Sequence, residues 1–171
     1  CIRDRKNTML IDVNKEGYID LVMLENILKS INNKKKIIVS VMFANNETGI
    51  IQPIKKIIKI TKIYQVPFHT DEVQAIGRLN INFLKLDIDM MTISSHKIGG
   101  PSGAGALIVN SKKHILKPLL LGGDQEDSLR SGTEPLLAIA GFGQAAELLD
   151  IKQIEKLKNL RICLLYTSDA A

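Results

Sequence analysis

The run from Lys36 to Phe43 constrains the fold more than any other stretch of the chain. Its centre, residues 37–42, reads Ile-Ile-Val-Ser-Val-Met and is nearly continuous in apolar and β-branched residues. Strands of this composition are typical of parallel sheets with both faces covered, whereas strands of half-exposed sheets alternate apolar and polar residues. The run therefore predicts a strand buried on both faces of a parallel sheet.

The segments after this run supply a crossover to a second strand. Pro53 is suited to the first turn of a helix, and apolar residues recur at helical spacing across residues 54–61, with lysines between them. A short apolar run at residues 66–70 then predicts another strand. Because a strand, helix and strand in succession form a right-handed crossover between parallel strands, both strands should end at the same edge of the sheet.

The remaining segments complete an α/β pattern. Further strands are expected at residues 8–13, 88–93 and 103–109, with another apolar segment at 115–121. One helix should begin after an Asp20 cap, and a long one should run from Pro135 to about Leu160. The fold class predicted is α/β, with a mostly parallel sheet flanked by helices.

Composition narrows the possible partners. The chain has 171 residues, 45% of them hydrophobic, which is enough for one domain with a substantial core. No apolar run reaches the length of a membrane span, so we expect no membrane partner. The net charge of +5 comes from lysines on predicted helix faces and turns, and only 4% of residues are aromatic, so we expect no nucleic-acid partner.

Two features that could indicate a metal site do not do so. Cys1 and Cys163 lie near the two ends without the spacing of a zinc site or a disulfide framework, which suits a reducing compartment. Residues 12–19 imitate the start of a calcium-binding loop, but its twelfth position, which must supply a bidentate glutamate, is Met23. We therefore expect no metal ion.

Lys97 lies just after the predicted strand 88–93, in Ser94-Ser-His-Lys-Ile-Gly-Gly-Pro101. In an open α/β sheet, ligands bind beyond the carboxyl ends of the strands. A desolvated lysine amine there attacks carbonyl groups, as in a Schiff base with pyridoxal phosphate. That cofactor also needs a carboxylate at its ring nitrogen, and Asp71 follows the strand 66–70. Taken singly, such residues are usually a solvated lysine and a helix cap, but together they favour the cofactor.

Four motifs resemble the cysteine desulfurases of the class V aminotransferase group, which are fold type I pyridoxal-phosphate enzymes. The motifs are Asn45-Asn-Glu-Thr-Gly49, His69-Thr-Asp-x-x-Gln74, Ser94-x-His-Lys97 and Arg130-Ser-Gly-Thr-Glu134. The resemblance implies that residues 1–162 are part of the cofactor-binding large domain and that the C-terminal small domain is absent. Residues 163–171 abandon the helical pattern, and we interpret them as a non-native tail.

The resemblance also implies a role for each matched residue. Lys97 would be the catalytic residue that bonds pyridoxal 5'-phosphate, Asp71 would pair with the ring nitrogen, and Gln74 would bind the phenolic oxygen. Asn46 would lie against the ring and contact the substrate carboxylate. The phosphate would be held by three further residues, the last from the neighbouring subunit of a homodimer: Ser94, His96 and Thr133.

The activity implied is removal of sulfur from L-cysteine, giving L-alanine and an enzyme-bound persulfide. A sulfur-acceptor or scaffold protein would receive the sulfur for iron–sulfur cluster or thio-cofactor assembly, in the cytoplasm or, in a eukaryote, in mitochondria. The family's sulfur-accepting cysteine lies in the small domain, and Cys163 matches no motif, so the fragment should be inactive alone. Selenocysteine lyases share these motifs, and a non-catalytic scaffold that keeps the fold is a further alternative.

The chain departs from the family pattern in one loop. Asp124 and Asp127 lie where the family has a third glycine and an arginine. This departure affects the local loop or a dimer contact and leaves the cofactor-binding residues intact.

Overall fold

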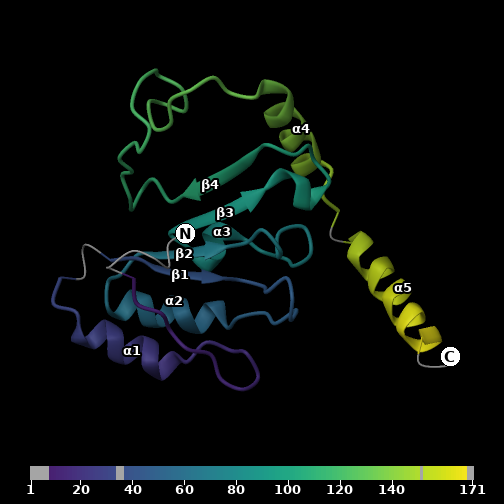
Figure 1. The fold of residues 1–171 in the computed structure, drawn as a ribbon, viewed down its shortest axis with the longest axis horizontal. Helices are drawn as coiled ribbons and strands as arrows, with labels where there is room; N and C mark the ends of the chain where they lie inside the picture. The colour runs from purple at the N-terminus through teal and green to yellow at the C-terminus, as the bar shows by residue number, and fades with distance from the viewer. Residues whose placement is uncertain (1–7, 34–36, 151, 169–171) are drawn as a thin grey trace.

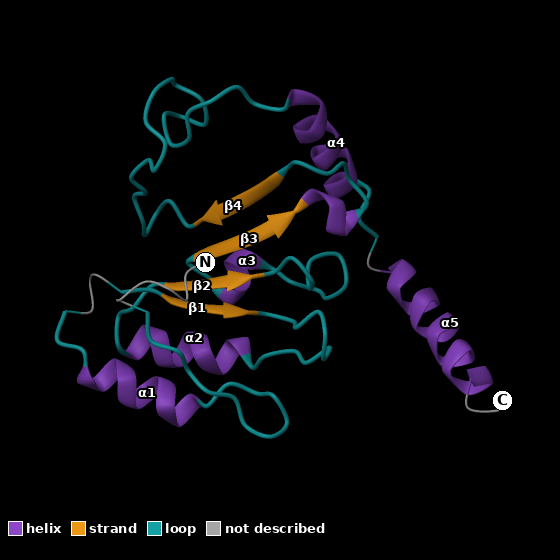
Figure 2. Ribbon diagram, in the orientation of Figure 1, coloured by secondary structure: helices purple, strands orange, loops and turns teal. Residues whose placement is uncertain are grey.

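A computed structural model describes residues 8–33, 37–150 and 152–168 of the chain, with a four-stranded sheet at its centre (Figures 1 and 2). The strands lie in the order β1 (Val39–Met42), β2 (Phe68–Asp71), β3 (Met90–Ser94) and β4 (Gly105–Val109). The first three are parallel, and β4 is antiparallel to β3. The predicted α/β class with a mostly parallel sheet is confirmed, although Lys36 of the predicted first strand lies outside the described residues.

Helices precede and connect the strands as the periodicity predicts. Helix α1 begins after Asp20, whose carboxylate accepts hydrogen bonds from the Val22 and Met23 amides at 2.9 Å each. Helix α2 follows Pro53 and forms the crossover from β1 to β2. The helices are α1 (Leu21–Ser30), α2 (Ile54–Ile63), α3 (Phe83–Leu86), the 3-10 helix η3 (Ser95–Ile98), α4 (Leu136–Glu147) and α5 (Lys152–Ser168).

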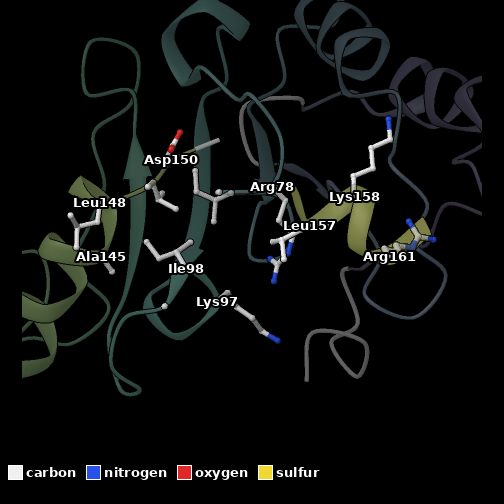
Figure 3. Close-up of a pocket in the computed structure, with 13 residues that line it drawn as sticks. Arg78, Lys97, Ile98, Ala145, Leu148, Asp150, Leu157, Lys158 and Arg161 are labelled. Carbon is white, nitrogen blue, oxygen red and sulfur yellow. The ribbon is translucent and has the colours of Figure 1, made fainter. Parts of the chain in front are cut away.

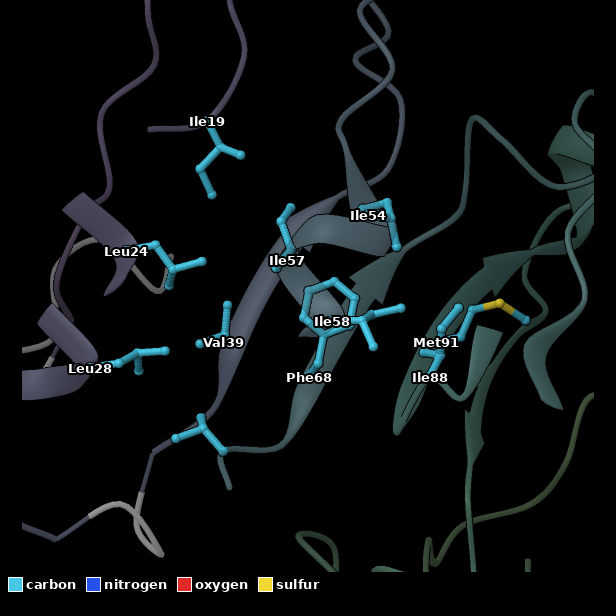
Figure 4. Close-up of a cluster of buried hydrophobic side chains, with 11 residues drawn as sticks. Ile19, Leu24, Leu28, Val39, Ile54, Ile57, Ile58, Phe68, Ile88 and Met91 are labelled. Atoms are coloured by element: carbon cyan, nitrogen blue, oxygen red, sulfur yellow. The ribbon is translucent and has the colours of Figure 1, made fainter. Parts of the chain in front are cut away.

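The hydrophobic core lies between helices α1 and α2 and one face of the sheet (Figure 4). Phe68 of β2 and Met91 of β3 point into it, and Ile57 of α2 is fully buried there. Removing such side chains from water is the main force that holds α2 against the strands. The central members of the core are Ile19, Leu24, Leu28, Val39, Ile54, Ile57, Ile58, Val66, Phe68, Ile88 and Met91.

The other face of the sheet is much less covered within the described part of the chain. Ser40 is exposed, and His69 and Asp71 are half-buried, although their neighbours Val39, Phe68 and Thr70 are buried. The prediction that the first strand is buried on both faces is therefore wrong for this structure. The apolar run corresponds to the face of β1 that α2 covers. No described helix covers the opposite face, on which Ser40 lies, in the same way.

Two other local predictions are also wrong. Residues 8–13 form no strand and make only an isolated bridge between Val13 and Ile19. The apolar segment 115–121, for which the sequence predicts no particular element, is loop, with Ile115 95% exposed. The long helix predicted from Pro135 is divided into α4 and α5.

Helix α5 extends away from the sheet (Figure 1) and runs on to Ser168. Residues 163–168 thus continue a helix, against the expected loss of helical pattern, because apolar periodicity is not needed for a helix that packs on little. Residues 169–171 lie outside the described residues, and the non-native origin of 163–171 remains a prediction.

Candidate functional site

Two neighbouring parallel strands bring Asp71 and Lys97 to the same edge of the sheet. Asp71 is the last residue of β2 and pairs in register with Thr92 of β3. Lys97 follows five positions later in the chain, on the 3-10 turn η3 that begins directly after β3. Parallel strands place their carboxyl ends together, so the candidate amine and carboxylate come from adjacent strand ends.

The strand alternation sets the direction of the Asp71 side chain. Phe68 and Thr70 are buried on the α2 side, so Asp71 and His69 lie on the opposite, less covered face. One Asp71 carboxylate oxygen accepts a hydrogen bond from the Val73 amide at 2.9 Å, which closes a tight turn after β2. Gln74 lies half-buried on the same turn.

Two glycines end the short turn that carries Lys97. Gly99 ends η3 in the left-handed region at φ 89°, a conformation that favours glycine, and the Gly100 amide bonds back to the Ser95 carbonyl at 3.0 Å. A side chain at Gly100 would meet the Ser95 hydroxyl. These glycines let the chain reverse immediately after the lysine.

Ser94 and His96 form a hydroxyl–imidazole pair beside Lys97. The Ser94 Oγ and the His96 Nδ1 lie 2.9 Å apart, with Ser94 at the end of β3 and His96 exposed on η3. Both groups can donate hydrogen bonds to an anion, which is the chemistry that phosphate recognition requires. The structure therefore brings together two of the residues expected to hold a phosphate.

Asn46 and Thr133 lie on separate loops. Asn46 is exposed in the turn after β1, which Asn45 stabilises by accepting hydrogen bonds from the Glu47 and Thr48 amides at 2.9 and 2.8 Å. Because β1 is parallel to β2, this turn is at the same sheet edge as Asp71. Thr133 is exposed in the loop between β4 and α4, which arches away from the sheet (Figure 1).

A cavity of about 700 Å³ lies next to η3 (Figure 3). Its lining includes Lys97, the C-terminal end of α4 and the middle of α5, but not Asp71, Gln74, Ser94 or His96. In Figure 3 the Lys97 amine and the Asp150 carboxylate point to opposite sides of the cluster. Lys97 is thus the one predicted cofactor-binding residue in the lining of this cavity, which is not a space that the predicted residues share.

Glu72 is a buried acid that the motifs do not single out. It is fully buried, and neither carboxylate oxygen has a hydrogen-bond partner among the described residues. Burial raises its pKa to about 8, the Asp71 carboxylate adds to the rise, and the Thr70 hydroxyl opposes it without completing a hydrogen bond. The raised pKa favours the protonated, uncharged form of Glu72 at neutral pH. The signal that could have found it is strand alternation, since residues 68, 70 and 72 share one face.

The described residues contain no group of three His, Cys, Asp or Glu side chains placed to bind a metal ion. None of the helices in the described ranges combines the length and apolarity that crossing a membrane requires.

Comparison with known proteins identifies the family. The model of the family described as aminotransferase class-V matches residues 3–165. The chain belongs to this family. Its predicted resemblance to cysteine desulfurases within the class V group is confirmed by the names of its relatives.

Two curated relatives and one solved structure illustrate the similarity. Cysteine desulfurase IscS of Dictyoglomus turgidum is 42% identical over 154 residues, covering 88% of this chain and 38% of the relative. The mitochondrial cysteine desulfurase of Saccharomyces cerevisiae is 46% identical over 140 residues, covering 81% of this chain and 27% of the relative. A NifS-like protein from Rickettsia africae superimposes with a TM-score of 0.90 at 44% identity, covering 99% of this chain and 48% of that chain. The chain thus spans well under half the length of these curated relatives.

Proposed function

We propose that this chain is the cofactor-binding part of a cysteine desulfurase that uses pyridoxal 5'-phosphate. The observation that carries the proposal is the placement of Asp71 and Lys97 at the carboxyl ends of adjacent parallel strands. The donor set fits this cofactor: one amine, one carboxylate, and the Ser94–His96 pair for a phosphate. When bound, the cofactor supplies an electron sink that weakens bonds in an attached amino acid.

The chain's own residues would bind and orient this group. Lys97 would hold it covalently through its amine, while Asp71 would keep the ring nitrogen protonated by opposing its positive charge. Ser94 and His96 would donate to the phosphate, and Gln74 would donate to the ring's phenolic oxygen. Asn46 would contact the carboxylate of the substrate.

The whole protein would take sulfur from L-cysteine, release L-alanine and pass the sulfur to an acceptor or scaffold protein for iron–sulfur cluster or thio-cofactor assembly. The names of the relatives favour this reaction over the selenocysteine-lyase alternative. They include bacterial and mitochondrial proteins, so we propose a cytoplasmic or, in a eukaryote, a mitochondrial location.

A homodimer is also proposed, with Thr133 reaching the phosphate of the partner subunit. Large apolar side chains exposed near this loop support such an association: Leu121 is 82% exposed, and Leu136 and Leu137 are 72% and 91% exposed. Sedimentation of the chain at increasing concentration tests the dimer. A single monomeric species at every concentration would contradict it for this chain.

Covalent capture of the cofactor tests the proposed function directly. The chain is incubated with pyridoxal 5'-phosphate, reduced with borohydride and digested, and we expect the cofactor's added mass on the peptide that contains Lys97. Lys97→Ala should lose that label, while Lys112→Ala, an exposed lysine on the loop after β4, should keep it. Equal labelling of all three proteins would favour the non-catalytic scaffold.

A second measurement asks whether the chain alone turns over substrate. With L-cysteine present, we expect no alanine, because Cys163 lies on α5 and belongs to none of the four motifs. Appreciable alanine formation would show that the groups needed for sulfur release are within these residues.

A further inference from the structure

His69 lies on the same sheet face as Asp71, two residues earlier on β2. Side chains two positions apart on a strand point the same way and lie roughly 7 Å apart along it. The register with the neighbouring strand β1 agrees with this placement, since His69 pairs with Ser40 and Asp71 pairs with Met42, two positions further along β1. None of the roles proposed above uses this imidazole.

Ser40 fixes the His69 ring across the sheet. Its Oγ lies 2.8 Å from the His69 Nδ1, between the two residues that face each other in the β1–β2 register. Since this bond occupies Nδ1, Nε2 is the ring nitrogen left for another group. The hydroxyl thus holds a titratable ring in one orientation on the Asp71 face.

The charge of this ring matters to Asp71. Burial lowers the pKa of His69, while the Asp71 carboxylate opposes that shift, so the two groups interact electrostatically. A cationic ring at this position would compete with any other cation for the Asp71 carboxylate. An uncharged ring leaves that negative charge free.

We propose that His69 is a positioning residue: held by Ser40 on the Asp71 face, its uncharged imidazole keeps the Asp71 carboxylate available to the cofactor's ring nitrogen. This inference rests on the proposed function. In this inference His69 and Ser40 support the cofactor site, and they affect cofactor binding only through Asp71.

A double-mutant cycle on cofactor affinity tests the inference. The dissociation constant of pyridoxal 5'-phosphate is measured by absorbance titration for the unsubstituted chain, His69→Lys, Asp71→Asn and the double variant. We expect His69→Lys, a fixed cation, to weaken binding about tenfold, and to have little effect once Asp71 is asparagine. His69→Gln, which is uncharged, should bind within about threefold of the unsubstituted chain.

Two results would overturn the inference while the proposed function stands: equal affinity of His69→Lys and His69→Gln, or the same tenfold loss with and without Asp71. Failure of the unsubstituted chain to label Lys97 would instead refute the proposed function.

The coupling of the two residues is also measurable without cofactor. NMR titration of the His69 ring should show a lower pKa in Asp71→Asn than in the unsubstituted chain, because the carboxylate stabilises the charged ring. An unchanged His69 pKa would overturn the inference, whatever the cofactor does.

Discussion

Glu72 gives the sharpest test of the electrostatics at the carboxyl end of β2. Its side chain is fully buried next to Asp71 without a hydrogen-bond partner for either oxygen among the described residues. Burial raises its pKa from 4.5 to about 8 in the folded chain. The substitution to examine is Glu72→Gln, which keeps the size of the side chain and removes its ionisation.

The sign of the effect follows from proton binding. Between pH 4.5 and about 8 the folded chain holds a proton on Glu72 that the unfolded chain has lost. The free energy of unfolding therefore falls as the pH rises, by about 1.4 kcal/mol per pH unit for this one group. Between about pH 5.5 and 8 the loss amounts to about 3 kcal/mol. Glutamine has no such loss, so the variant should gain that much relative to the unsubstituted chain.

Urea unfolding followed by circular dichroism at both pH values measures the difference. Other titrating groups contribute equally to both proteins and cancel. Glu147→Gln, at an exposed position on α4, is the control and should show no such gain. If Glu72→Gln and the unsubstituted chain lose stability in parallel as the pH rises, Glu72 is ionised in the folded state and the argument is wrong.

Four further substitutions test packing and turn conformations, each by urea unfolding. Asp89→Ala should lower the free energy of unfolding by roughly 3 kcal/mol, because Asp89 accepts a hydrogen bond from the buried Phe68 amide at 3.0 Å and bonds the His114 Nε2 at 2.9 Å. A decrease below about 1 kcal/mol would contradict this. On α4, Gly141→Ala should destabilise the fold, because the added Cβ would lie 2.5 Å from Pro101. Gly143→Ala, where a Cβ meets open space, should instead stabilise the fold by up to about 1 kcal/mol. Equal effects of the two substitutions would refute the packing of α4 against Pro101. Glu126→Gly should stabilise by roughly 1 kcal/mol, since Glu126 has φ 50°, and a loss of stability would show that its side chain is needed.

The parts of the fold that the sequence predicts are those with local causes. The Asp20 cap, the helical spacing of residues 54–61 and the crossover from β1 to β2 each depend on residues close together in the chain, and all are present in the structure. The break between α4 and α5 was not predictable in this way. Apolar residues continue past Glu147, but α4 ends there, and the Leu148 amide caps it by bonding to the Gln144 carbonyl at 3.1 Å.

Apolar periodicity does not show which element, if any, covers each face of a strand. An apolar run has the same composition whether helices cover one face of its strand or both faces. The sequence therefore indicates that β1 has a buried face, but it does not indicate that Ser40 is exposed. The antiparallel direction of β4 is set by the chain reversal at Gly99–Gly105, which a glycine-rich sequence permits but does not specify.

The candidate site shows the same limit of sequence prediction, because the motif of residues 69–74 contains His69 and Glu72 but gives neither of them a role. Motif matching finds residues at strand ends, such as Asp71 and Lys97, because their sequence neighbours are distinctive. Glu72 and His69 are defined instead by the side of β2 on which they lie: one toward the core, where its charge is suppressed, and one beside Asp71, where its charge would compete. Since a one-residue shift of register would exchange these two environments, the chemistry of the site depends on the alternation of β2 as directly as on the identity of its residues.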